Sequence, residues 1–111
     1  MRENIKVTLA EGETIFFGPG AEELFQLIKD TGSVRDAATK MSMSYSKAWK
    51  LIRLAEDTLD RKLVERSKGG EGGGGSAYLT EYGEKFLETY RNYSKEVQEA
   101  AEEIFRRHYH D

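Results

Sequence analysis

The sequence contains no cysteine, a single proline and no long hydrophobic run in its 111 residues. The absence of cysteine excludes disulfide bonds, thiolate metal sites and cysteine-based catalysis. No stretch reaches the roughly 18 consecutive apolar residues that could span a membrane, and the N-terminus lacks the apolar segment of a signal peptide. We therefore expect one compact cytoplasmic domain with no membrane contact.

The chain also has little net charge, because 17 basic residues against 20 acidic ones leave only −3. The distribution along the chain is uneven, however. Residues 1–34 carry a net −3, residues 35–68 carry +4, and residues 69–111 carry −4. A basic island between acidic flanks indicates a polyanionic partner for the middle third, which the total charge conceals.

The N-terminal third predicts two strands and a helix. Apolar residues alternate over residues 5–9, which is typical of a half-buried strand, and residues 14–17 predict a second strand after a turn at Gly12. A short amphipathic helix follows over about residues 21–30, and Gly32 is suited to its left-handed C-cap.

Two short helices in the basic island form a helix-turn-helix candidate. Ser33 and Ser44 are suitable N-caps, and the second helix should run over about residues 44–57. A recognition helix places exposed polar side chains against base edges in the major groove. The residues that could do so are Ser44, Tyr45, Ser46, Lys47, Lys50 and Arg53. The alternative is an ordinary amphipathic helix with a solvated basic face.

A β-hairpin is predicted next, from strand signals at residues 62–67 and 76–80 on either side of a glycine-rich tip. Glycines let a backbone approach phosphates closely. The tip formally satisfies G-x-G-x-x-G, but a strand rather than a helix follows it, so we reject a dinucleotide site. A linker is the alternative to a hairpin. The candidate DNA contacts here are Arg66, Lys68, Gly69, Gly70, Gly72 and Gly73.

A long helix is predicted over about residues 80–108, with Thr80 as its cap. Its apolar residues follow an a/d heptad pattern, with a second stripe beside it, and a helix this two-sided favours a dimer interface. The alternative is that the helix packs wholly on its own domain, and the pairing direction of two helices stays open. The interface candidates are Phe86, Tyr90, Tyr93, Val97, Ala100, Ala101, Ile104 and Phe105.

No grouping of residues suggests catalysis. No nucleophile and base stand together in a recognisable pattern, and His108, His110 and Asp111 form only a weak metal motif at the chain terminus. We expect a protein that is not an enzyme and has no metal and no cofactor.

Several motifs together resemble a known family. They are Thr31-Gly32-Ser33-Val34, Ser44-Tyr45-Ser46-Lys47-Ala48-Trp49, Leu63-Val64-Glu65-Arg66, the glycine run 69–75 and Leu79-Thr80-Glu81-Tyr82-Gly83. In order and spacing they are similar to the N-terminal winged-helix domain of the ModE family, molybdate-responsive transcriptional regulators related in design to LysR-type DNA-binding domains. The chain ends after the long helix, so we expect the family's C-terminal molybdate-binding domains to be absent and metal sensing to be doubtful. Ser42 stands in the turn where such motifs commonly have glycine.

The resemblance implies a homodimer that binds a palindromic operator, with DNA contacts from residues 44–50 and from a wing over residues 66–75. We expect a mainly α protein with small β elements, a winged helix-turn-helix over 1–79 and a dimerisation helix over 80–111. Arg35, at the start of the first short helix, is a further phosphate candidate. Double-stranded DNA and a second copy are the expected partners, and room remains for a separate effector-sensing partner. The alternative function is a protein-interaction module that reads no DNA.

Overall fold

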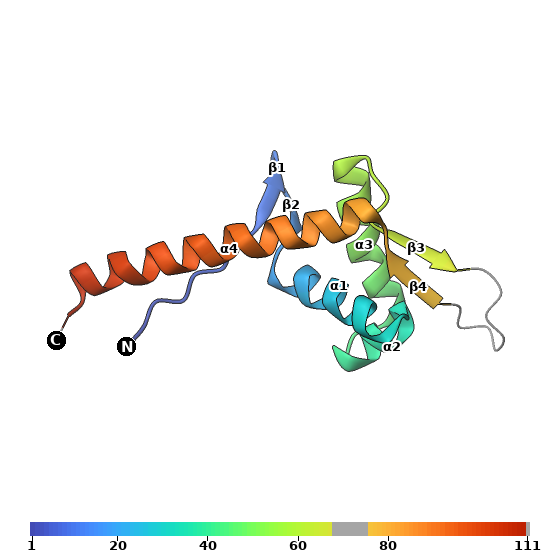
Figure 1. The fold of residues 1–111 in the computed structure, drawn as a ribbon, viewed down its shortest axis with the longest axis horizontal. Helices are drawn as coiled ribbons and strands as arrows, with labels where there is room; N and C mark the ends of the chain where they lie inside the picture. Colours follow the sequence, from blue (N-terminus) through green and yellow to red (C-terminus); the bar gives the residue numbers. More distant parts are fainter. Residues whose placement is uncertain (68–75, 111) are drawn as a thin grey trace.

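Three short helices form the body of the computed structural model, which describes residues 1–67 and 76–110 (Figure 1). They are α1 (Pro19–Thr31), α2 (Val34–Lys40) and α3 (Tyr45–Leu59). α1 packs against each of the other described helices, and its Leu24, Phe25 and Ile28 are fully buried because they share one helical face. Gly32 ends α1 with φ 71°, as predicted.

A small N-terminal hairpin precedes the helices. Strands β1 (Leu9–Glu11) and β2 (Thr14–Phe17) pair antiparallel, and Gly12 takes φ 59° in the turn between them. The predicted strand over residues 5–9 is wrong for residues 5–8. Strand pairing begins only at Leu9, and the residues before it run beside the long helix instead (Figure 1).

The second hairpin follows α3. Its strands, β3 (Val64–Ser67) and β4 (Ser76–Leu79), pair antiparallel, so the predicted hairpin is confirmed with its first strand beginning two residues later than expected. Val64, Ala77 and Leu79 face the core, as strand alternation requires. The N–H of Ala77 also donates to the carbonyl of Gly32 at 2.8 Å, which fastens the hairpin to the end of α1.

The last element is the long helix α4 (Glu81–His108), close to the predicted range. The Thr80 side chain caps it by accepting from the N–H of Gly83 at 2.9 Å. Leu87 and Tyr90 bury the first half against the body, whereas the second half extends away from it and makes the molecule 59 Å long (Figure 1). The predicted class, mainly α with small antiparallel sheets, is confirmed.

Candidate nucleic-acid interface

The helix-turn-helix is built from two serine-capped helices. The Ser33 hydroxyl accepts from the N–H of Asp36, and the Ser44 hydroxyl accepts from the N–H of Lys47, each at 3.0 Å. Both predicted caps are therefore present, and each satisfies a backbone donor that a helix start leaves free. In the turn, Ser42 takes the left-handed conformation with φ 56°, at a cost of about 1 kcal/mol for a residue with a β-carbon.

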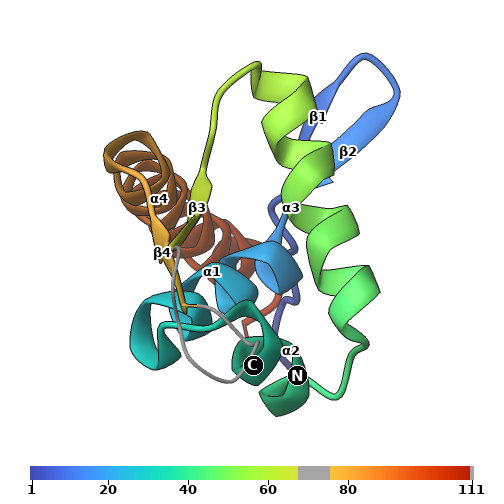
Figure 2. The same ribbon diagram turned by 90° about the vertical axis from the view of Figure 1, so that its right-hand side faces the viewer.

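Alanines let these two helices approach closely. Ala37 and Ala38 of α2 and Ala48 of α3 are buried, and small side chains at such positions bring helix backbones together. Ile52 and Ala55 continue the buried face of α3. α3 consequently has one side fixed in the core, and Figure 2 shows it along one flank of the body with α1 between it and α4.

The opposite side of α3 is exposed and basic. Ser46, Lys47 and Lys50 are all exposed, and so is Arg53 one turn further on. The ion pairs found in the described part of the chain all lie on α1 and α4. The positive charge of α3 is thus not neutralised by a carboxylate at contact distance, which favours binding of an external anion.

Arginines around α3 lie over aromatic rings. The Cζ atom of Arg35, from α2, is 4.3 Å from the centroid of the Tyr45 ring. The Cζ atoms of Arg66, from β3, and of Arg53 are 4.3 Å and 5.3 Å from the Trp49 ring. Three predicted DNA contacts from three different elements therefore come together around the N-terminal half of α3, with guanidinium groups held at the surface.

Only one of the predicted wing contacts lies within the residues that the structure describes. Arg66 is exposed on β3, close to α3. The other predicted contacts lie outside the described residues: Lys68, Gly69, Gly70, Gly72 and Gly73.

Two residues of the predicted dimer seam are used inside the chain. The Tyr90 hydroxyl donates to the carbonyl of Val7 at 2.7 Å, and its ring packs edge-on against Phe17. Phe86 is half-buried and packs edge-on against the same phenylalanine. Only 2% of Tyr90 remains exposed, which corrects its assignment to an intermolecular seam. Phe86 is only half-buried and stays an interface candidate. Burial raises the pKa of Tyr90, and the charge of Glu22 raises it further.

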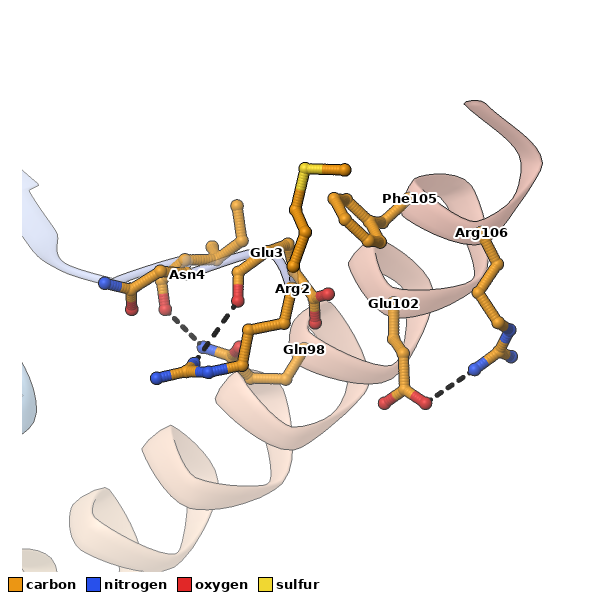
Figure 3. A pocket seen from close by; sticks show the side chains of 9 residues that line it. Arg2, Glu3, Asn4, Gln98, Glu102, Phe105 and Arg106 are labelled. Carbon is orange, nitrogen blue, oxygen red and sulfur yellow. Dashed lines mark hydrogen bonds and ion pairs between the residues drawn. The ribbon is translucent and has the colours of Figure 1, made fainter. Parts of the chain in front are cut away.

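The other seam residues lie at different depths. Tyr93, Ala100 and Ile104 are exposed, whereas Val97, Ala101 and Phe105 are half-buried. Figure 3 shows why Phe105 is partly covered: the first residues of the chain lie across this part of α4. Gln98 donates from Nε2 to the carbonyl of Ile5 at 2.7 Å and holds that segment in place.

Within residues 1–67 and 76–110, no three potential metal-binding side chains gather in one place. His108 and His110 are exposed, and Asp111 lies outside the described residues. No helix in this part of the chain is long and apolar enough to cross a membrane.

Comparison with known families agrees with this geometry. The model of bacterial regulatory helix-turn-helix proteins of the lysR family matches residues 21–84, which include most of α1 and all of α2, α3, β3 and β4. The chain belongs to this family. It is a family of regulatory proteins and not of enzymes.

Individual relatives are regulators named ModE, so the predicted resemblance is confirmed. The transcriptional regulator ModE of Yersinia pestis is 38% identical over 81% of this chain. The DNA-binding transcriptional dual regulator ModE of Escherichia coli K12 is 36% identical over the same share. This chain spans about a third of the length of either relative. A chain in the crystal structure of the CbnR_DBD–DNA complex has the same fold, with a TM-score of 0.57 and 23% identity over 73% of this chain and 86% of that one.

Two residues of this lysR-family domain were not among the predicted site residues. The side chains of Arg53 and Arg66 lie over the ring of Trp49. The sequence signal that could have identified Trp49 was its position in the Ser44–Trp49 motif. Glu56 is buried, and its carboxylate accepts from the N–H groups of Leu63 (2.9 Å) and Val64 (3.2 Å), which ties the end of α3 to the start of the wing. Its spacing of four from Ile52 places it on the buried face of α3.

Proposed function

We propose that this chain is a DNA-binding module of a transcriptional regulator of the ModE and LysR type, with α3 in the major groove. The observation that carries the proposal is the exposed basic face of α3, which no carboxylate of the described chain neutralises. DNA provides the matching charge, and its major groove admits a helix whose polar side chains reach base edges.

The N-terminal half of α3 provides the side chains for base contacts. Ser46, Lys47 and Lys50 are exposed there and have no structural hydrogen bond from their side chains in the described chain. Ser44 uses its oxygen as a cap acceptor, but the hydroxyl hydrogen stays free to donate to a phosphate. Tyr45 contributes to DNA binding indirectly, because the guanidinium group of Arg35 lies over its ring.

Phosphate contacts come from the flanks in this proposal. The candidates are Arg35 on α2, Arg53 on α3 and Arg66 on β3, whose guanidinium groups lie over aromatic rings of α3. Contacts of this kind to phosphates orient a protein on the duplex. The roles of Lys68, Gly69, Gly70, Gly72 and Gly73 rest on the family resemblance alone, because these residues lie outside the described part.

We further propose a homodimer that binds a palindromic operator. Tyr93, Ala100 and Ile104 recur on one face of α4 at helical spacing, and Tyr93 and Ile104 are 53% and 47% exposed. This face extends beyond the body of the chain, so a second α4 can pack along it (Figure 1). Two copies related by a two-fold axis would present two recognition helices to two half-sites.

The DNA experiment begins with selection of a binding site from random duplexes, with and without oxyanions such as molybdate. Lys50→Ala should then weaken binding to the selected duplex by about 1–3 kcal/mol, or about 5- to 150-fold. Lys95→Ala is the matched control, because it removes the same charge from an exposed position on α4. Equal affinity of Lys50→Ala and the wild type would remove Lys50 from the interface. A wild type without salt-dependent DNA retention would refute the function and favour the protein-interaction module.

The dimer is tested on the same chain. Ile104→Glu places a charge within the exposed apolar face and should shift the protein toward monomer in sedimentation experiments. Asn92→Glu adds the same charge at an exposed position about a third of a turn around the helix, so it should leave the dimer intact. A dimer that survives Ile104→Glu would place the interface elsewhere.

A further inference from the structure

We propose that Trp49 is a positioning residue for DNA binding, whose indole ring holds Arg66 in place for the phosphate backbone before DNA arrives. The inference rests on the proposed function and extends it from the residues that touch DNA to the one that orients them. The guanidinium group of Arg53 lies over the same ring.

The contact follows from the strand register. Val64 and Arg66 are two residues apart on β3, so their side chains leave the same side of the hairpin. Their partners on β4 are Leu79 and Ala77, both buried, so this side faces the body of the protein. Arg66 is too long to remain within the core, and it extends along α3 until its Cζ atom lies 4.3 Å from the centre of the Trp49 ring.

Trp49 itself is held firmly. Only 7% of it is exposed, and Tyr45 packs against it edge-on with ring centroids 6.5 Å apart. Arg53, four residues later on α3, places its Cζ atom 5.3 Å from the same ring. A ring fixed by packing is a suitable support for long arginine side chains, because the ring itself does not have to be ordered when DNA binds.

Stability alone does not explain a tryptophan here. Its Nε1 is buried without a hydrogen-bond partner in the described chain, and an unpaired buried donor destabilises a fold. A phenylalanine would fill much of the space without that donor. Tryptophan, however, attracts a guanidinium group more strongly than any other aromatic side chain. The choice is therefore accounted for by the arginines that it receives.

A stacked guanidinium is well prepared for a phosphate. The Cζ atom of Arg66 lies over the indole, and a guanidinium that lies flat on a ring keeps its in-plane N–H donors directed outward along the edge. Arginine can then donate two parallel hydrogen bonds to one phosphate group. Because the side chain is already ordered, less conformational entropy is lost on binding. The Cζ atom of Arg35 likewise lies 4.3 Å from the centre of the neighbouring Tyr45 ring.

The test uses the fact that Trp49 is the only tryptophan, so intrinsic fluorescence reports on this ring alone. Arg66→Lys keeps the charge but removes the planar group. In the free protein it should change the Trp49 emission. On the selected duplex it should weaken binding about 3- to 10-fold, with the same dependence on salt because the charge is unchanged. Arg91→Lys on α4 is the matched control and should change neither quantity.

A double-mutant cycle separates positioning from a general structural effect. Trp49→Phe should weaken binding less than Trp49→Leu, and Arg66→Lys should cost little more once Leu is present. Circular dichroism verifies that Trp49→Leu folds; if it does not, the same cycle is run with Trp49→Phe. Additive losses, or wild-type affinity of Arg66→Lys, would overturn the positioning role while DNA binding stands. A wild type that binds no DNA would instead overturn the proposed function and this role together.

Discussion

Replacement of Gly83 by alanine is a demanding test of the fold, because local and tertiary reasoning predict opposite signs. Gly83 lies in the first turn of α4, where alanine should favour the helix by about 1 kcal/mol. A β-carbon there would fall far inside van der Waals contact of the carbonyl oxygen of Leu63, and 3.1 Å from its carbonyl carbon. These are backbone atoms, which a rotamer change does not relieve.

The structure sets the size of the penalty. Overpacking a tight contact costs about 1–3 kcal/mol. The Leu63 carbonyl also accepts the N–H of Thr80 at 2.9 Å, and displacing it endangers a bond whose loss costs about 1–3 kcal/mol. After the gain in helix propensity is subtracted, Gly83→Ala should lower the free energy of unfolding by about 1–5 kcal/mol.

Urea unfolding followed by circular dichroism measures this difference at one fixed protein concentration. With an m-value of about 1.5 kcal/mol per molar, a loss of about 3 kcal/mol lowers the midpoint by about 2 M. Gly20→Ala is the matched control, since Gly20 also lies at the start of a helix and a β-carbon there meets nothing within 4 Å. A Gly83→Ala variant as stable as the wild type would refute the close contact with Leu63.

Tyr90→Phe should lower the free energy of unfolding by about 1–2 kcal/mol in the same assay, because the Val7 carbonyl loses its hydrogen-bond donor. Tyr93→Phe is the control: its ring is exposed, so the free energy of unfolding should change by less than about 0.5 kcal/mol. Burial, and then the nearby negative charge, raises the pKa of Tyr90 in the folded state, so the folded state binds this proton more tightly than the unfolded state does. The resulting stability is fully present below the unfolded pKa and is lost as pH rises through the folded pKa. The loss of stability at alkaline pH should therefore be smaller in Tyr90→Phe than in the wild type. Parallel curves of stability against pH for the two proteins would exclude Tyr90 as the source of the loss. Gln98→Ala should cost less than about 1 kcal/mol yet move the NMR chemical shifts around Ile5 toward random-coil values, and unchanged shifts would show that this hydrogen bond does not hold the segment.

Features that depend on neighbouring residues were readable from the amino-acid order. Ser33, Ser44 and Thr80 were predicted as caps because a capping oxygen bonds a backbone N–H only two or three residues away. The buried face of α3 followed from helical periodicity in the same way. The candidate DNA contacts on this helix were accordingly predictable, as the exposed polar side of a helix whose apolar side must be buried.

Features that join distant segments were not readable. The heptad pattern of α4 does not distinguish Tyr90 from Tyr93, because the same apolar stripe is compatible with an intermolecular seam and with an intramolecular core. Packing against Phe17 and the carbonyl of Val7, 83 residues away, assigns Tyr90 to the core. The same limit applies to residues 5–8, whose alternation resembles a strand but whose partner is a helix.

Local order was therefore sufficient for the helices, their caps and the polar side of α3, because each depends on contacts within about one helical turn. The three-dimensional packing settled which apolar side chains of α4 remain exposed and which ring receives Arg66. Strand β3 carries that arginine back across the end of α3 to Trp49, 17 positions earlier in the chain. Such contacts arise only when hydrophobic burial has brought the elements together, and no periodicity within a single element encodes them.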